Sequence, residues 1–230
     1  SVEIYCEGKR REKVILERLV CMGIGYLFGL FQTSYLYGKA NHLDIREHGS
    51  GNAGTTNALR TMGKKAGALT LLGDCLKCVL AVLVVRLIYR DSQADILPLL
   101  SMYAAAGCIL GHNFPIYLRF RGGKGVAASV GMILVLDWRV FLICAVVFFS
   151  IFFATHYVSL CSVSAYLVAL ALVIAFGQLG AYQMSQPRVW EMDGVLACLT
   201  LLALYRHREN IKRLLNGSEN KIFLKSGKKV

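Results

Sequence analysis

The residues that could carry out chemistry in this 230-residue chain gather in three polar stretches between long apolar runs. The first stretch, residues 44–57, reads DIREHGSGNAGTTN and combines glycines with neutral hydrogen-bond donors. Glycine lets successive backbone N–H groups point at one anion, and an arginine fork fits phosphate oxygens. A turn with a capping asparagine would explain a shorter stretch. The density of glycines and phosphate-binding groups in this stretch favours an anion site. Its candidate residues are Ser50, Asn52, Gly54, Thr56, Asn57 and, just beyond the stretch, Arg60.

The second stretch, residues 111–126, contains the sequences GHNFP and GGKG. It is not a Walker A loop, because no glycine stands five positions before Gly123 and no Ser or Thr follows Lys124. A basic loop at a membrane face would explain GGKG alone, and His112 could equally cap a helix. If this loop lies on the same membrane face as the first, the two stretches can form one anion site. Its candidates here are His112, Gly122, Gly123, Lys124 and Gly125.

The third stretch is the C-terminal tail, which begins HRENIKRLLNGSENK at His207. His207, Asn210 and Arg213 are three residues apart and therefore share one face of a helix. A solvated basic helix that touches anionic lipid is the alternative for this segment alone. His207 stands at a membrane boundary beside polar partners, which makes it the candidate general base. Ser159 adds a hydroxyl at the start of an apolar span, although serines in such helices often bond only their own backbone.

The composition identifies the chain as an all-α, polytopic membrane protein. Hydrophobic residues make up 56% of the sequence, against roughly 45–50% in ordinary soluble domains. The net charge of +12 lies in loops and tails, where it sets topology and attracts anionic head groups of membrane lipids, so nucleic acid is not an expected partner. The eight cysteines lie mostly in apolar segments and predict neither a disulfide nor a metal site.

The apolar runs predict a transmembrane domain over residues 14–206, between a charged tail at 1–13 and a basic C-terminal segment at 207–230. Asp74 and Lys77 lie three residues apart in the second span, so they can pair within the membrane, either at a functional site or as a lock on the bundle. Residues 187–193 are predicted to form a turn. The seven predicted helices are residues 14–37, 66–89, 97–110, 127–136, 139–155, 157–182 and 194–205.

The positions of Lys and Arg predict which membrane face carries the motifs. Positive charge concentrates in the loops at 39–65 and 112–126 and in the C-terminal tail, whereas the loops on the other side carry little. Basic short loops remain in the cytoplasm. The three polar stretches are therefore predicted to face the cytoplasm, against the contrary signal of the basic N-terminal tail.

In this order and at this spacing, DIREHGSGNAGTTN, GHNFPIYLRFRGGKGVA, THYVSLCS and YRHRENIKRLLNGSE resemble the motifs of the bacterial acyl-phosphate:glycerol-3-phosphate acyltransferases. The resemblance spans about residues 23–222. It implies a seven-helix enzyme of the bacterial inner membrane, with its active site facing the cytoplasm and with no metal or other cofactor. The implied reaction transfers a fatty acyl group from acyl phosphate to the sn-1 hydroxyl of glycerol 3-phosphate, which yields lysophosphatidate and phosphate.

The resemblance also implies roles for individual residues. The first motif and Lys124 with its glycines would hold the two phosphates, and Ser159 would line the same cavity. His207 would take the proton from the attacking hydroxyl, unless a phosphate oxygen of a substrate does so, because acyl phosphate is already activated and needs chiefly positioning and charge stabilisation. The polar residues implied to complete the catalytic and substrate-binding set are Ser50, Arg208, Asn210 and Arg213.

The chain departs from the family pattern at a few positions. Residues 29–32 read Gly-Leu-Phe-Gln where Gly-Ser-Ile-Pro is usual, and Thr55 and Ala128 stand where Ala and Thr are usual. These departures bear on acyl-chain preference and N-terminal packing more than on the reaction. Two other functions fit less well. A transporter or lipid-phosphate binding protein would usually show repeated halves, and none is visible. A lipid-embedded scaffold would leave the glycine-rich loops unexplained.

Overall fold

The computed structural model describes the backbone of residues 2–223 and the side chains of residues 13–223. Within these residues every regular element is helical, which confirms the predicted all-α class. The last part of the predicted C-terminal segment, residues 224–230, lies outside the described residues. The α-helices are α1 (Val2–Gly29), α2 (Thr33–Ala40), α3 (Thr55–Tyr89), α4 (Leu97–Asn113), α5 (Val126–Leu136), α6 (Trp138–Thr155), α7 (Val158–Gln178), α8 (Gln186–Arg206) and α9 (Arg208–Leu215).

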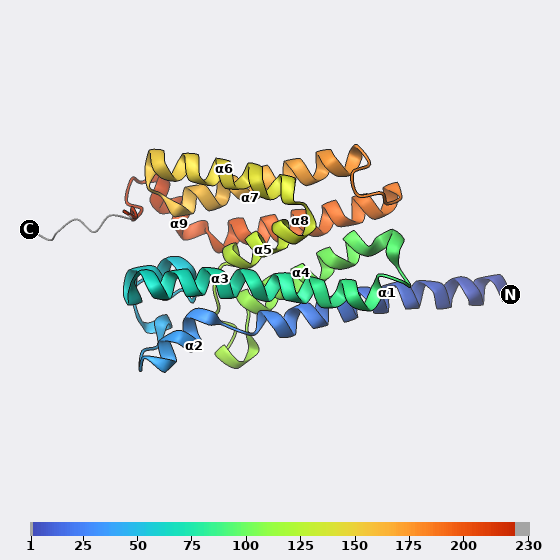
Figure 1. Ribbon diagram of the computed structural model, residues 1–230, viewed down its shortest axis with the longest axis horizontal. Helices are drawn as coiled ribbons and strands as arrows, with labels where there is room; N and C mark the ends of the chain where they lie inside the picture. Colours follow the sequence, from blue (N-terminus) through green and yellow to red (C-terminus); the bar gives the residue numbers. More distant parts are fainter. Residues whose placement is uncertain (1, 224–230) are drawn as a thin grey trace, which may run out of the picture.

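The long helices run roughly along the long axis of the molecule (Figure 1). α2, the start of α3, the start of α7 and α9 lie toward the left of the view, whereas the α3–α4 and α7–α8 connections lie toward the right. We call the first of these regions the motif end, which comprises residues 41–60, 111–126, 156–162 and 206–223, and the second the opposite end. α4 is the central helix, because most of its side chains are buried and it packs against α1, α3, α5 and α8.

Five helical segments are long and apolar enough to cross a membrane, namely 13–40, 55–89, 94–118, 138–155 and 158–178. α5 is apolar but has only 11 residues, in agreement with the short helix that the sequence predicted at 127–136. α8 has 21 residues and is not among the five candidate spans. The protein is therefore a multi-pass membrane protein, but the predicted number of seven membrane helices is not confirmed.

Glycines bring α1 and α4 into close contact. Gly25 and Gly29 on α1 face Gly107 and Gly111 on α4, each pair being four residues apart. A Cβ atom on Gly25 would lie 1.8 Å from the Ala104 carbonyl oxygen, so only glycine allows this crossing. Small residues at a spacing of four are the usual means by which helices approach closely in membranes.

The predicted span at 14–37 agrees with the apolar segment 13–40, but it is not one continuous helix, because α1 ends at Gly29 and α2 begins at Thr33. The side-chain amide of the buried Gln32 stabilises this break by donating to the carbonyl oxygens of Gly29 and His112, both at 3.1 Å. Both carbonyl groups lie in the last turn of a helix, where the helix itself supplies no partner, and that of His112 also accepts from the Gly123 N–H at 3.1 Å. Gln32 stands where proline is usual in the family that the sequence resembles, and its amide carries out this capping.

Two further boundaries differ from the sequence prediction. α3 begins at Thr55, earlier than the predicted residue 66, and kinks at Gly63, where φ is +88°. Residues 55–57 therefore belong to the first turn of a helix and not to the preceding loop. The turn predicted at 187–193 is also wrong, because these residues form the first turns of α8. Pro187 is compatible with this position, since proline is tolerated where a helix begins.

Candidate active site

The loop before α3 is shaped by one side chain, that of the buried Asn57. Its amide nitrogen donates to the carbonyl oxygens of Ile45 and His48, at 3.2 and 2.9 Å, and its Oδ1 accepts from the backbone N–H of Ser50 at 3.0 Å. The amide of Asn57 thus holds the loop in place, whereas the side chain of Ser50 is exposed. Asn52 folds back over Gly54, where an added Cβ would meet its Nδ2 at 2.8 Å.

Four helices begin at the motif end: α3 at Thr55, α5 at Val126, α7 at Val158 and α9 at Arg208. The first N–H groups of a helix have no partner within the helix and attract anions. Two hydroxyl groups near these starts, Thr55 Oγ1 and Ser159 Oγ, are buried and have no hydrogen-bond partner among the described residues. Buried hydroxyls without a partner are rare, so these positions suit contact with a bound ligand.

The second loop requires glycine because other groups fill the space beside it. A Cβ atom on Gly122 would lie 2.0 Å from the His112 carbonyl oxygen. One on Gly123 would lie 2.1 Å from His112 Nε2 and 3.0 Å from the Ala53 carbonyl oxygen. The nearness of Ala53 shows that the first and second polar stretches pack together. Gly125, with φ of +81°, allows the chain to turn into α5.

The C-terminal stretch is joined to the second loop through Arg206 and Lys124. Arg206 Nη2 donates to the carbonyl oxygens of Gly123 and Gly122 at 2.6 and 3.3 Å, and Lys124 Nζ donates to Asn210 Oδ1. Glu219, which is 9% exposed, accepts from Asn210 Nδ2 at 2.9 Å and from Arg213 Nε at 2.8 Å. Glu219 therefore orients the amide of Asn210 so that its oxygen faces Lys124.

The ionisable groups of this region are partly desolvated. Burial, reinforced by the nearby charge of Arg213, lowers the pKa of Lys124 to about 8. His207 is 3% exposed, and burial lowers its pKa to about 4, so the ring is neutral near pH 7. His207 Nδ1 lies 2.8 Å from the Ala203 carbonyl oxygen, which can only accept, so Nδ1 carries the proton. Nε2 of His207 is therefore left with a lone pair that can accept a hydrogen bond.

The structure brings most of the predicted residues together but not all of them. His112, the glycines of the second loop, Lys124, His207, Asn210 and Arg213 form one cluster. Arg60 reaches the C-terminal stretch by donating to the Asn220 carbonyl oxygen at 3.1 Å. Arg208 is exposed and lies over the Tyr205 ring, 4.4 Å from its centroid. Its predicted substrate contact stays a prediction, as do the roles of the other residues.

Sequence reasoning missed three polar residues of this region. Arg206 ties the C-terminal stretch to the second loop, and Glu219 links Asn210 to Arg213. Asn113 is 1% exposed, and neither its oxygen nor its nitrogen has a hydrogen-bond partner among the described residues. The sequence offers one signal for Asn113, its position directly after His112 in GHNFP. It offers none for Arg206 and Glu219, which resemble other charged residues of the basic C-terminal stretch.

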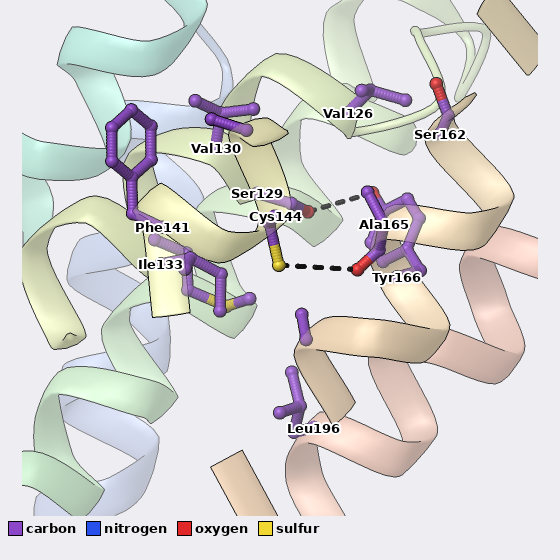
Figure 2. A pocket seen from close by; sticks show the side chains of 13 residues that line it. Val126, Ser129, Val130, Ile133, Phe141, Cys144, Ser162, Ala165, Tyr166 and Leu196 are labelled. Atoms are coloured by element: carbon purple, nitrogen blue, oxygen red, sulfur yellow. Dashed lines mark hydrogen bonds between the residues drawn. The ribbon is translucent and has the colours of Figure 1, made fainter. Parts of the chain in front are cut away.

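An apolar cavity of about 90 Å³ opens next to the second loop, between α5, α6, α7 and α8. Its lining begins at Val126, directly after Gly125, and extends to Leu196 on α8 (Figure 2). Two polar contacts join its lining residues, the 2.9 Å hydrogen bond between Ser129 Oγ and the Tyr166 hydroxyl and the 3.7 Å bond from Cys144 Sγ to the Ala165 carbonyl oxygen (Figure 2). The site thus combines a basic polar region with an adjoining apolar space.

Comparison with known proteins identifies the family. A family model described as glycerol-3-phosphate acyltransferase matches residues 19–217. The chain belongs to this family. The chain is 43% identical to the glycerol-3-phosphate acyltransferase of Clostridioides difficile, over 90% of its own length and 97% of the relative's, and 40% identical to that of Bacillus subtilis, over 86% and 94%.

Solved structures agree with this assignment. The protein is similar to a crystal structure of PlsY, an integral membrane glycerol 3-phosphate acyltransferase, in its glycerol 3-phosphate form, with a TM-score of 0.77 and 30% identity. The match covers 90% of this chain and 96% of that one. The lysophosphatidic acid form of PlsY gives a TM-score of 0.75. The protein is accordingly a membrane-embedded acyltransferase, which confirms the enzyme class that the motifs predicted.

Metal ligation is not indicated by the side chains that are described. Among them, no group of three or more His, Cys, Asp or Glu side chains is placed to hold a metal ion. Cys75 and Cys78, the C-x-x-C pair, are both free thiols on α3.

Proposed function

We propose that the protein transfers a fatty acyl group from acyl phosphate to the sn-1 hydroxyl of glycerol 3-phosphate, with lysophosphatidate and phosphate as products. The single observation that carries this proposal is the joining of the three polar stretches into one basic site beside an apolar cavity. A substrate pair with two phosphates and one fatty chain matches those two surfaces. The names of the relatives and the glycerol 3-phosphate form of PlsY support the acceptor.

In this proposal the two phosphates are held by cations and helix starts. Lys124, Arg60 and Arg206 donate only to neutral oxygens among the described residues, so their charge remains available to an anion. The N-termini of α3 and α5 add backbone N–H groups beside them. The acyl chain would enter the cavity that begins at Val126. The carbonyl carbon would then lie at the boundary between the polar and apolar parts of the site.

His207 would accept a hydrogen bond from the attacking hydroxyl through Nε2. Its pKa of about 4 makes it a weak base, so we favour an oxygen of the leaving phosphate as the final proton acceptor. The hydroxyl oxygen forms the new ester bond, the bond between the acyl carbon and the phosphate oxygen breaks, and the hydroxyl proton leaves with the phosphate. Lys124 would stabilise the charge that develops on that leaving group.

The proposal places this site in the cytoplasm, at the inner membrane of a bacterium, because the basic loops 39–65 and 112–126 share the motif end. The experiment that tests the reaction supplies purified protein with glycerol 3-phosphate and either acyl phosphate or acyl-CoA. The expected result is phosphate release and sn-1 lysophosphatidate with acyl phosphate alone. Product formed equally from acyl-CoA would contradict the proposed donor. Binding of both substrates without product would favour a lipid-phosphate binding protein.

A further inference from the structure

We propose that the buried pair Asp74–Lys77 is a positioning device that holds His112 with its proton on Nε2, so that His112 donates a hydrogen bond to a substrate phosphate. This inference rests on the proposed function, because it names a donor for the same site. It assigns a role to two ionisable residues of α3 that the reaction described above leaves unused. Asp74 and Lys77 act only through His112.

Lys77 is the centre of the network. Its Nζ donates to the Phe31 carbonyl oxygen at 2.6 Å and to Asp74 Oδ1 at 2.8 Å, and it lies 2.9 Å from His112 Nδ1. The side chains of Lys77, Asp74 and His112 are 4%, 1% and 3% exposed. Asp74 also accepts from the Thr33 hydroxyl at 3.0 Å. The predicted ion pair within the membrane span is thereby confirmed, and it includes a third member.

The chemistry of an ammonium group fixes the proton on His112. A lysine ammonium has three donors and no acceptor. Because two of the Lys77 donors go to Phe31 and Asp74, the third points at His112 Nδ1, which must accept. A neutral imidazole that accepts at Nδ1 carries its hydrogen on Nε2. Asp74 pairs with the Lys77 ammonium at 2.8 Å and fixes the direction of one of its donors, so the carboxylate and the ammonium together select this tautomer.

The donor selected in this way points at the motif end. His112 Nε2 lies beside Gly123, close enough that a Cβ atom there would stand 2.1 Å away. The Ala53 carbonyl oxygen borders the same space. Nε2 therefore lies at the seam between the first and second loops, and it has no hydrogen-bond partner among the described residues. A phosphate bound by these two loops would lie where the Nε2–H group of His112 can donate a hydrogen bond to it.

A purely structural lock would not require this arrangement. Buried ion pairs are often no more stabilising than well-packed apolar residues, so helix packing alone gives weak grounds for Asp74 and Lys77. Arg18 and Glu191 form such a lock between α1 and α8, and their network also includes Arg188 and the hydroxyl of Tyr103. The Asp74–Lys77 network differs because it ends on a donor that faces the two glycine-rich loops.

His112 and His207 then have opposite tautomers. His207 donates through Nδ1 to the Ala203 carbonyl oxygen and keeps a lone pair on Nε2, whereas His112 accepts at Nδ1 and keeps a proton on Nε2. The His207 ring can accept a hydrogen bond from a hydroxyl group, and the His112 ring can donate one to a phosphate oxygen. Two neutral histidines can in this way supply one acceptor and one donor to the same reaction.

The first test reads the tautomer directly in the wild-type protein. Imidazole nitrogen chemical shifts are measured on detergent-solubilised protein with isotope-labelled histidine, and His112→Gln identifies the His112 signals by their loss. The expected result is a neutral ring protonated on Nε2. A ring protonated on Nδ1, or on both nitrogens, would overturn the inference even if the enzyme is fully active. This readout does not depend on acyl transfer.

The second test measures kcat and KM with Asp74→Asn and Lys77→Met in one chain, which leaves no unpaired buried charge. We expect kcat/KM to fall by about 10- to 100-fold, the range for a lost hydrogen bond to a charged group, and the tautomer of His112 to become mixed. His112→Gln keeps an N–H group near the Nε2 position and should retain more activity than His112→Asn, which does not. Equal losses in these two variants would contradict the donor role.

The coupling between the pair and His112 gives the deciding control. Added to His112→Gln, the Asp74→Asn and Lys77→Met changes should cost no more than about twofold in kcat/KM, because residues that act as a unit are not additive. Full additivity would show that the pair acts independently of His112. Arg18→Met with Glu191→Gln, a matched pair at the opposite end, should leave kcat and the His112 tautomer unchanged. If wild-type protein makes no lysophosphatidate, the proposed function fails while the tautomer result stands.

Discussion

Two clusters at opposite ends of the bundle use the same charged residue types in opposite ways. At the opposite end Arg18 pairs with Glu191, at 2.8 Å between Nη2 and Oε2, and Tyr103 donates to the same carboxylate at 2.9 Å. At the motif end Lys124 and Arg206 donate to an amide and to backbone carbonyl groups. A cation with its own carboxylate holds helices together. Lys124 and Arg206 donate only to neutral oxygens among the described residues, so their charge is available to an incoming anion.

After the loss of Lys124, the removal of His207 should have the largest effect at the motif end. His207→Ala deletes the Nε2 acceptor that is proposed to bind the attacking hydroxyl, and positioned groups that assist proton transfer contribute about 100-fold or more. We expect kcat to fall by this factor while the melting temperature in detergent changes little. The assay is lysophosphatidate formation under saturating substrates. Retained turnover in well-folded protein would remove His207 from the reaction.

Glu219→Ala should have the next largest effect, because Glu219 is the acid that orders the motif end. Without it the amide of Asn210 loses its 2.9 Å contact and Arg213 loses its partner at 2.8 Å. We expect kcat/KM to fall by about 10-fold, and stability to fall by about 1–3 kcal/mol for the lost charged hydrogen bonds. Glu209→Ala is the control, because Glu209 is an exposed acid on α9. Equal effects of the two changes would contradict the ordering role.

A smaller effect is expected from pH. The pKa of Lys124 is lowered to about 8 by burial and neighbouring cations, so the free enzyme loses this charge as the pH rises through 8. The wild-type kcat/KM should therefore fall above about pH 8. Bound phosphate raises the pKa of Lys124, so the corresponding fall in kcat should occur at higher pH. Lys124→Arg keeps its charge and should lack this limb. An identical limb in the variant would assign it to another group.

The smallest effect on activity is expected at the opposite end. Glu191→Gln weakens the pair with Arg18, whose side chain is 9% exposed. We expect a lower melting temperature, corresponding to about 1–3 kcal/mol, with kcat unchanged within twofold. Thermal unfolding and steady-state kinetics on the same preparation check this. A loss of kcat without a loss of stability would contradict the proposal that the Arg18–Glu191 pair is structural whereas the motif end carries the reaction.

Much of the bundle could be predicted from sequence, because apolar length and local spacing determine it. The helices at 97–113, 126–136 and 138–155 agree closely with their predicted spans, and the spacing of three residues predicted the Asp74–Lys77 pair. The break after Gly29 could not be predicted in this way. It depends on the carbonyl groups of α4 that Gln32 caps, and these are 80 residues away in sequence.

The sequence predicted that the polar stretches converge. It did not predict which of their residues hold the loops in place and which are available to a substrate. Asn57 looked like a phosphate ligand, whereas its amide is occupied by the loop it shapes. Glu219 became visible only when the chain after α9 folded back onto Asn210 and Arg213. Such roles depend on contacts between distant segments, which residue type and spacing do not reveal.

The most direct test of the central claim is phosphate release from acyl phosphate that depends on glycerol 3-phosphate, measured for Lys124→Ala and Lys212→Ala beside the wild type. Lys124 lies in the second loop beside Asn210, whereas Lys212 is exposed on α9 and contacts Glu209 at 3.5 Å. We expect Lys124→Ala to abolish the release while the protein stays folded, and Lys212→Ala to behave like the wild type. Undiminished release from Lys124→Ala would contradict a site built on unpaired charge.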